Sequence, residues 1–305
     1  MTTKKYSLGL DIGASSVKYG WGDCQHGLQF FSKKPITTKS LSCLKDTIES
    51  ILTETDKSVG LANILSIGIG TPGTIDTKTG KLVGVNPNLP FWVGHRPDEL
   101  IPSDMVIPAH YDNDANLMAL AEAWLRGSRG RMIGVTVGSG IGCGFVEDNR
   151  IYRGSHGYAL ELGHITIYPG GELCSCGRKG CLEAYASVEG IRTRLRKIAG
   201  FMPDKDLDSG LADILKKKDA HHNVANVIRE GMQALAIGLA NVVLLFDPDL
   251  IVLGGGAMDA GLYDMRELND LLFSLLPTAN ASKLKLERAL EGNRAGVLGA
   301  IILAS

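Results

Sequence analysis

A polar loop at residues 111–116, with the sequence YDNDAN, is the clearest place in this chain for acid–base chemistry. It follows the apolar-led run Met105–Pro108 and leads into residues 115–125, whose apolar side chains recur at helical spacing. A carboxylate at a strand-to-helix junction lies near free backbone N–H groups and the positive end of the helix dipole, so it stays ionised and accepts protons. We predict that Asp114 is a general base. The alternative is that one of these Asp or Asn residues only caps the helix.

A second group of reactive side chains lies between residues 164 and 181. Cys174, Cys176 and Cys181 form a C-x-C-x₄-C run, and His164 precedes it. Three thiolates and a neutral imidazole satisfy tetrahedral zinc with no open position, which predicts a structural site. The other three cysteines are dispersed along the chain, and bunched cysteines in a reducing compartment favour a metal over disulfides. Free thiols are the alternative.

Two glutamates flank this cysteine and histidine cluster. Glu161 lies just before His164, and Glu183 lies just after Cys181. A metal that holds His164 would also hold both carboxylates near one rigid loop. We expect them to be available to sugar hydroxyls.

Three glycine-rich turns follow apolar runs. The first run, residues 6–13, ends in Asp11 and Gly13 and leads into small residues that can approach phosphate oxygens, while Asp11 could hold hydrated Mg²⁺. The second turn, residues 138–144, follows a strand at 132–137; because no helical pattern comes next, a dinucleotide-binding βαβ unit is disfavoured. We expect these two loops to clamp a triphosphate between two lobes. A hairpin turn explains the first loop equally well.

The third glycine turn, Gly254–Gly256, ends an Ile-Val-Leu strand. Its missing side chains would let an adenine or ribose approach the backbone, and a tight strand-to-helix turn is the competing explanation.

The segment 71–76 is a turn that suits a cleft wall, and residues 86–92 place amide side chains beside an aromatic ring. That composition fits sugar hydroxyls and apolar ring faces, but Asn-Pro and Leu-Pro are also ordinary turn formers. We favour the turn interpretation for Asn86 and leave Asn88 open.

The remaining pattern describes an α/β scaffold. A helical face at 44–52 precedes a buried strand at 65–70, and Gly127 ends the helix after the polar loop. A long apolar-periodic helix spans 224–243, and a final apolar helix at 294–303 could return to the first lobe.

Composition narrows the class of partner. The chain has 305 residues, a formal net charge of −1 and 21% charged residues without a long basic run, which disfavours nucleic acid and favours a small molecule. No stretch reads as long and apolar enough to span a bilayer, and no signal-peptide core opens the chain, so we expect a cytoplasmic protein. Its length suits two lobes with a cleft.

The order of these motifs resembles the ROK family of bacterial sugar kinases and regulators. The resemblance covers almost the whole chain and includes LDIG near the start, NDAN, GSGIG, ELGH, the cysteine run and LGGG. It implies a two-lobed, actin-like or hexokinase-like (ribonuclease H-like) α/β fold. We expect a small N-terminal lobe at 1–112, joined by the helix at 293–305, and a large lobe at 113–292 that contains the zinc knuckle at 164–181.

The resemblance also implies roles for single residues. Asp114 would deprotonate the sugar 6-hydroxyl, and His164 would be shared between the sugar and zinc. The sugar-binding positions would be Gly73, Asn88, Asn113, Asp114, Glu161, His164 and Glu183. The ATP-binding positions would be Asp11, Gly13, Ser15, Ser16, Lys18, Gly138, Ser139, Gly140, Gly254, Gly255 and Gly256. The zinc ligands would be His164, Cys174, Cys176 and Cys181.

This chain departs from the family pattern in two places. Where many members have Gly-Gly-Thr-Lys in the first phosphate loop, residues 13–18 read GASSVK, which displaces the lysine. Where the family has glycine before the glutamate, this chain has Leu160, which narrows the sugar end of the pocket.

The resemblance therefore predicts ATP-dependent phosphorylation of a hexose, with Mg²⁺, structural Zn²⁺ and a homodimer, and with glucose converted to glucose 6-phosphate. Kinases for N-acetylmannosamine, fructose or mannose are alternatives, and polyphosphate remains open as the donor. A sugar-sensing repressor would carry an additional N-terminal DNA-binding segment, and only seven residues precede Leu8, which favours an enzyme. A catalytically silent sugar-binding module is disfavoured because Asp114 and both glycine loops occur together.

Overall fold

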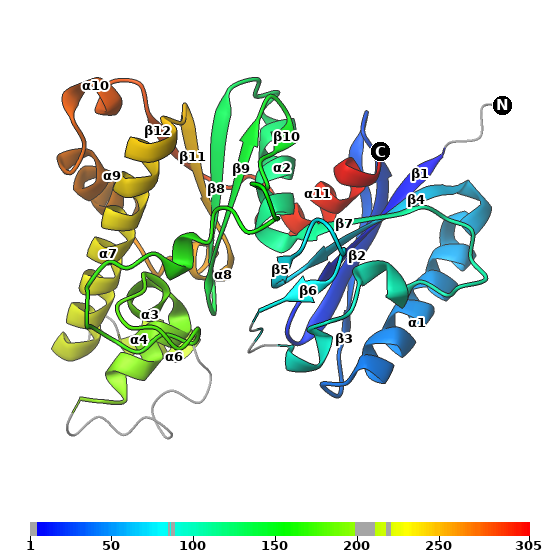
Figure 1. Cartoon of the computed structure of the whole chain (residues 1–305), viewed down its shortest axis with the longest axis horizontal. Coiled ribbons are helices and arrows are strands. Elements are labelled where there is room, and N and C mark those ends of the chain that lie inside the picture. Colours follow the sequence, from blue (N-terminus) through cyan, green and yellow to red (C-terminus); the bar gives the residue numbers. More distant parts are fainter. Residues whose placement is uncertain (1–4, 85, 87–88, 199–210, 218–220) are drawn as a thin grey trace. The chain divides into compact units, whose positions relative to one another are not determined.

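The computed structural model describes residues 5–84, 86, 89–198, 211–217 and 221–305 (Figure 1). Asn88, one of the predicted sugar-binding residues, lies outside the described residues. The fold is α/β, as predicted, with two five-stranded sheets and helices packed against them.

The chain forms two compact units. The first comprises residues 1–129, 144–159 and 293–305, and the second comprises 130–143 and 160–292. These bounds differ from those of the lobes expected at 1–112 and 113–292, because the helix that follows residue 113 packs on the C-terminal helix through Met118, Ala121 and Leu298. The boundary between the units falls within one strand, after Cys143.

The first unit contains strands β1 (Tyr6–Ile12), β2 (Ser16–Asp23), β3 (Gly27–Pro35), β4 (Ile64–Thr71), β5 (Thr74–Ile75), β6 (Leu82–Val83), β7 (Ala109–Asn113) and β10 (Arg150–Ile151). Its α-helices are α1 (Leu41–Val59), α2 (Asp114–Leu125) and α11 (Ala295–Ala304), and its 3₁₀ turns include η1 (Leu61–Asn63), η2 (Pro90–Trp92) and η3 (Pro97–Leu100).

The second unit contains strands β8 (Arg131–Val137), β11 (Leu250–Gly254) and β12 (Lys285–Arg288), and strand β9 (Ile141–Glu147) crosses its boundary. Its helices are α3 (Glu183–Ala186), α4 (Val188–Leu195), α6 (Leu211–Lys217), α7 (His222–Phe246), α8 (Gly256–Asp259), α9 (Met265–Ser274) and α10 (Thr278–Ala281). The 3₁₀ turn η4 spans Leu162–His164, and η5 (Gly292–Arg294) joins the two units in sequence.

The first sheet has the order β3-β2-β1-β4-β7, in which β1, β4 and β7 are parallel. The register pairs Asp11 with Gly70, and Gly70 with Asp112. The carboxyl ends of parallel strands meet at one edge, so Asp11 and the polar loop that begins α2 lie at the same edge of the sheet. The expected strand-to-helix junction is present, but its strand is β7, since Met105–Pro108 lies before the strand and has no regular structure.

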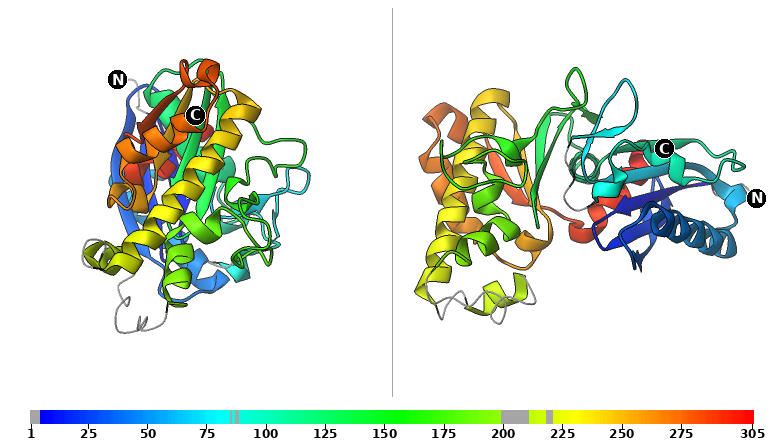
Figure 2. Two further views of the ribbon diagram at one scale, coloured as in Figure 1. Left: turned by 90° about the vertical axis from the view of Figure 1, so that its left-hand side faces the viewer. Right: turned by 60° about the horizontal axis from the view of Figure 1, so that its bottom comes forward.

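Alternation along β1 and β4 decides which helix covers which face (Figure 2). Leu8 and Leu10 belong to the apolar cluster that contains Leu44 of α1. On the opposite face, a Cβ added at Gly68 would lie 1.9 Å from the Ala300 carbonyl oxygen of α11. Glycine therefore lets α11 lie directly on the backbone of the sheet, while the larger side chains pack against α1.

The second sheet has the order β10-β9-β8-β11-β12, in which β8, β11 and β12 are parallel. Gly254 at the end of β11 pairs with Thr136 near the end of β8, so the second and third glycine turns emerge at one edge. Gly255 has a φ of +93°, and a Cβ there would lie 2.5 Å from the Val137 carbonyl oxygen. The glycine at this position is required by the close approach of the two turns.

Helix α7 corrects the expectation that no stretch of the chain is long and apolar enough to span a bilayer. Its 25 residues are long and apolar enough to cross a membrane by length and composition, although 67% of its apolar window is buried inside the protein. It packs against α3, α4 and α9 in the second unit (Figure 1), as a core helix of a folded domain does.

Candidate functional site

Asp114 is the first residue of α2 and is half-buried. The N-cap of α2 is Asn113, whose Oδ1 accepts hydrogen bonds from the backbone N–H of Ala115 at 2.9 Å and of Asn116 at 3.3 Å. The capping interpretation therefore applies to Asn113. Asp114 itself accepts a hydrogen bond from the N–H of Ala115 at 2.9 Å and retains acceptor capacity for a substrate hydroxyl.

The pKa of Asp114 is raised to about 6. Burial is the larger cause, and the negative charge of Asp11 is the second. The expected effect of the helix end is present but is not the largest one: the backbone N–H of Ala115 lowers the pKa of Asp114, whereas desolvation raises it by more. A carboxylate with a pKa near 6 is mostly ionised at pH 7 and is a stronger base than an exposed one. Both properties suit general base catalysis.

Asp11 at the end of β1 forms an ion pair with Lys18 of β2. The Lys18 Nζ lies 3.0 Å from Asp11 Oδ2, and the antiparallel register places these two residues opposite each other. The Asp11 side chain is 10% exposed, and a Cβ added at Gly296 of α11 would lie 2.8 Å from its carboxylate. A carboxylate at a strand end supplies the oxygen donors that Mg²⁺ prefers.

The first phosphate loop is a tight turn between β1 and β2. The N–H of Gly13 donates to the Ser16 carbonyl at 2.9 Å, and the Ser15 carbonyl accepts from the N–H of Ile36. The hairpin interpretation is thus correct for the backbone of this loop. Lys18 lies inside β2 and is directed to Asp11, so the displaced lysine of the GASSVK sequence is part of an ion pair.

Asp112 and Arg153 form a polar contact that the sequence did not reveal. The Arg153 guanidinium donates to Asp112 Oδ2 at 2.6 Å. Asp112 Oδ1 accepts from the N–H of Asn113 and from Asn116 Nδ2, both at 2.8 Å. The buried carboxylate of Asp112 thereby holds two residues of the polar loop with one oxygen and Arg153 with the other. Arg153 comes from a separate segment, and no local pattern links it to the loop.

Gly73 and Asn113 lie together. The Asn113 Nδ2 donates to the Gly73 carbonyl at 3.1 Å. Asn86 is buried, donates to the Pro72 carbonyl at 3.0 Å and accepts from the N–H of Leu89 at 3.1 Å. The turn interpretation of Asn86 is confirmed, because its Oδ1 holds the backbone of its own turn at Leu89, while its Nδ2 holds the backbone next to Gly73.

In the second unit, two glycines of the second and third glycine turns have open space beside them. A Cβ added at Gly138 or at Gly256 would meet no atom within 4 Å, and neither residue has a positive φ. The protein's own packing does not require glycine at these two positions. Both positions leave open space beside the backbone. Ser139 is exposed between Gly138 and Gly140.

The four predicted metal ligands converge. Their donor atoms all lie within 4.8 Å of one another, with 3.7 Å between His164 Nδ1 and Cys174 Sγ and 3.7 Å between Cys176 Sγ and Cys181 Sγ. Tetrahedral zinc with the usual ligand distances has edges of about 3.6–3.8 Å between ligand atoms. Burial raises the pKa of Cys181 to about 12, so a bound cation would be needed to hold this thiol ionised at neutral pH. The donor set fits a closed metal site.

The two flanking glutamates differ in their surroundings. Glu161 is exposed and follows Leu160, which has a φ of +64° in the left-handed region. Glu183 begins α3, and both of its carboxylate oxygens accept hydrogen bonds: Oε2 from the N–H of Ile141 and Oε1 from the Ser175 hydroxyl, each at 2.9 Å. Sequence reasoning found both glutamates but missed Ser175 and Ile141 as partners.

The predicted site residues therefore form one group in each unit. The first unit holds Asp11, Gly13, Ser15, Ser16, Lys18, Gly73, Asn113 and Asp114. The second holds Gly138, Ser139, Gly140, Glu161, His164, Cys174, Cys176, Cys181, Glu183 and Gly254–Gly256.

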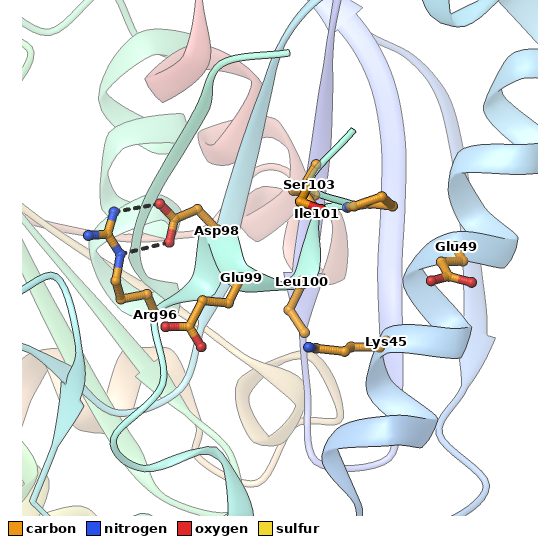
Figure 3. A pocket seen from close by; sticks show the side chains of 9 residues that line it. Lys45, Glu49, Arg96, Asp98, Glu99, Leu100, Ile101 and Ser103 are labelled. Carbon is orange, nitrogen blue, oxygen red and sulfur yellow. Dashed lines mark hydrogen bonds and ion pairs between the residues drawn. The ribbon is translucent and has the colours of Figure 1, made fainter. Parts of the chain in front are cut away.

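A cavity of about 540 Å³ lies in the first unit (Figure 3). Lys45 and Glu49 of α1 line one side, and Arg96, Asp98 and Glu99 line the other. Arg96 is already paired with Asp98 at 2.6 Å. None of the predicted site residues that the structure describes lines this cavity.

Comparison with known proteins agrees with the motif pattern. The model of the ROK family matches residues 7–305. The glucokinase of Halalkalibacterium halodurans is 30% identical over 97% of this chain and 93% of its own length. A putative xylose repressor of a Caldicellulosiruptor species is 32% identical over 79% of this chain, which spans only 62% of the length of that repressor.

The fold is similar to that of a ROK family glucokinase from Streptomyces griseus, solved in complex with glucose and AMPPNP. The TM-score is 0.80 at 25% identity, with 98% of this chain and 99% of that chain covered. The predicted hexokinase-like, actin-like fold class is confirmed.

Proposed function

The chain belongs to the ROK family, and from this premise we propose that it is an ATP-dependent sugar kinase that phosphorylates a hexose hydroxyl, with glucose as the acceptor at its 6-position. The observation that carries the proposal is the Asp114 carboxylate, half-buried at the carboxyl edge of the first sheet, with its pKa raised to about 6 by burial and by Asp11. The similarity to a glucokinase that binds glucose and AMPPNP supports the choice of sugar and donor.

In the proposed reaction, Asp114 accepts the proton of the attacking hydroxyl as that oxygen bonds to the γ-phosphorus of ATP and the bond to the β-phosphate oxygen breaks. The transition state of phosphoryl transfer is loose, so the protein acts chiefly by alignment and by charge stabilisation. Asn113 and the Gly73 carbonyl, which already contact each other, would orient sugar hydroxyls. Mg²⁺ bound with ATP would neutralise phosphate charge, and Asp11 is the residue that would hold it through water.

We propose that the metal bound by His164 and the three cysteines is structural zinc. The spacing of the donor atoms supports this assignment, and four protein ligands leave no open position for substrate. His164 would bind the metal through Nδ1, the atom nearest Cys174, and present its other ring nitrogen to the sugar.

A sugar-sensing regulator is the second candidate function. The similarity to the putative xylose repressor favours it, since the two proteins align over 79% of this chain. A regulator needs sugar binding but not phosphoryl transfer, so turnover separates the two candidates.

The test measures ADP formation with Mg-ATP across glucose, mannose, fructose, N-acetylglucosamine and N-acetylmannosamine. We expect turnover with glucose and its loss by about 10²- to 10⁴-fold in the Asp114→Ala variant. Titration calorimetry should show sugar and nucleotide affinities within a few fold of the original. Near-normal turnover of Asp114→Ala would refute the base assignment, whereas tight sugar binding without turnover on any sugar would indicate a regulator.

A further inference from the structure

One side chain joins the metal loop, residues 164–181, to the second phosphate loop, which is the glycine-rich turn at residues 138–144. We propose that Glu183 is a positioning residue through which the bound metal orders the loop 138–141 and thereby raises the affinity for the nucleotide. The nucleotide part of this inference rests on the proposed function, while the ordering of the loop stands on contacts within the second unit alone.

Both oxygens of Glu183 are used in the connection. Oε1 accepts from the Ser175 hydroxyl, and Oε2 accepts from the backbone N–H of Ile141, each at 2.9 Å. A carboxyl group has two oxygens, and each can accept hydrogen bonds independently of the other. The carboxylate therefore holds two segments that lie far apart in the sequence.

On the metal side, Ser175 stands between two of the ligands, Cys174 and Cys176, so it moves with the metal loop. Cys181, a third ligand, lies two residues before Glu183. Thr166 and Cys181 form an isolated β-bridge that ties the segment after His164 to the start of α3. Glu183 is therefore held on this side at two points, the Ser175 hydroxyl and the start of α3, and each point adjoins a metal ligand.

On the phosphate side, the same short region holds the loop at both ends. The N–H of Val188, at the start of α4, donates to the Gly138 carbonyl at 2.9 Å. At the other end, Glu183 Oε2 would lie 2.6 Å from a Cβ at Gly140, so the carboxylate fills the space that a side chain would take there. Glycine at 140 is explained by Glu183, unlike the glycines at 138 and 256.

Loss of the metal would free the residues around Ser175, and Glu183 would then lose one of its two partners. A carboxylate held at one end only restrains the Ile141 amide less well, and the loop samples more conformations. Nucleotide binding must then order the loop, which lowers the affinity. We expect coupling of about fivefold or more between metal and nucleotide, at the lower end of the usual range for linked sites.

The first experiment measures amide hydrogen exchange of Ile141 by NMR, without nucleotide. Three samples are compared: the zinc-loaded protein, the same protein after chelation, and zinc-loaded Ser175→Ala, with Ser175→Thr as the control that keeps the hydroxyl. We expect faster exchange of Ile141 after chelation and in Ser175→Ala, and near-original exchange in Ser175→Thr. Zinc content is measured in each variant, because Ser175 Oγ also lies 3.8 Å from Cys174 Sγ.

The second experiment measures Mg-AMPPNP binding by titration calorimetry on the same samples. Weaker binding in zinc-loaded Ser175→Ala than in Ser175→Thr supports the proposal even if chelation unfolds the protein. Unchanged exchange of Ile141 in Ser175→Ala, with zinc retained, would overturn it. If Ile141 responds as expected but no sample binds Mg-AMPPNP, the ordering stands and the proposed kinase function fails.

Discussion

At the scale of single residues, the chemistry depends on how Asp114 is solvated. An exposed aspartate at a helix start would have a low pKa and would be a weak base. Here burial and the like charge of Asp11 outweigh the backbone hydrogen bond, so the pKa of Asp114 rises to about 6. The carboxylate of Asp114 is therefore mostly ionised at neutral pH and is a stronger base than that of an exposed aspartate.

This pKa predicts an acid limb in the pH profile. Protonated Asp114 cannot accept the hydroxyl proton, so kcat/KM for the sugar should fall about tenfold per pH unit below about pH 6 and level off above it. Steady-state kinetics from pH 4.5 to 8.5 would measure the limb. The residual activity of Asp114→Asn should lack it, and a limb centred near the value of an ordinary aspartate would contradict the assignment.

Leu160 offers a test of backbone strain beside the predicted sugar site. Its φ of +64° is unfavourable for a residue with a Cβ, by roughly 1–2 kcal/mol, and glycine removes that cost. We predict that Leu160→Gly is more stable than Leu160→Ala by about 1 kcal/mol in urea unfolding. Both variants delete the leucine side chain, so their difference isolates the backbone term. Equal stability would show that the left-handed conformation carries no strain.

At the scale of elements, parallel strands gather residues that are distant in sequence. In the first sheet the carboxyl ends of β1 and β7 bring Asp11 to the edge where α2 begins, and in the second the ends of β8 and β11 bring two glycine turns together. Open α/β sheets bind ligands at such carboxyl ends. The arrangement explains why both groups of predicted residues follow strands.

The glycines of these elements should be of two kinds: those that the packing of the protein requires, and those that leave space for a ligand. A Cβ at Gly299 of α11 would lie 1.9 Å from the Leu117 carbonyl oxygen of α2, whereas one at Gly256 would meet nothing within 4 Å. We predict that Gly299→Ala lowers the free energy of unfolding by about 1–3 kcal/mol, because α2 and α11 must separate. Gly256→Ala should keep its stability but weaken Mg-AMPPNP binding. Thermal unfolding and calorimetry measure the two effects, and the reverse pattern would show that the classes are misassigned.

At the scale of the whole molecule, the metal loop is a long irregular segment whose local order depends on few buried apolar side chains. Its four ligands converge from residues 164 to 181, and such sites contribute directly to folding.

We predict one zinc per chain by plasma mass spectrometry. Cys176→Ser should lose the metal and lower Tm, since one ligand of four is gone. Cys24→Ser is the matched control, because Cys24 is exposed and lies outside the cluster. Equal zinc content in Cys176→Ser and Cys24→Ser would exclude this metal site.

Local patterns were enough to predict much of this protein. The convergence of His164 with the three clustered cysteines, the glycine turns after strands, and helices α1, α2, α7 and α11 all follow from residue spacing, because each reflects a period or a turn within about 25 residues of chain. The metal itself and the role of Asp114 as a base stay predictions. Helix bounds were less accurate, as for the strand before the polar loop, since Met105–Pro108 is apolar but does not pair in the sheet.

Contacts between segments that are distant in the sequence could not be predicted from local patterns and are seen only in the tertiary structure. Asp11 raises the pKa of Asp114 because parallel register places both at one edge, and Arg153 reaches Asp112 from another segment. Glu183 bonds to Ser175 and Ile141 because the metal loop folds back on β9. Residue types and spacing supply the reactive groups, but solvation, charge proximity and hydrogen-bond partners are properties of packing, and packing decides how those groups behave.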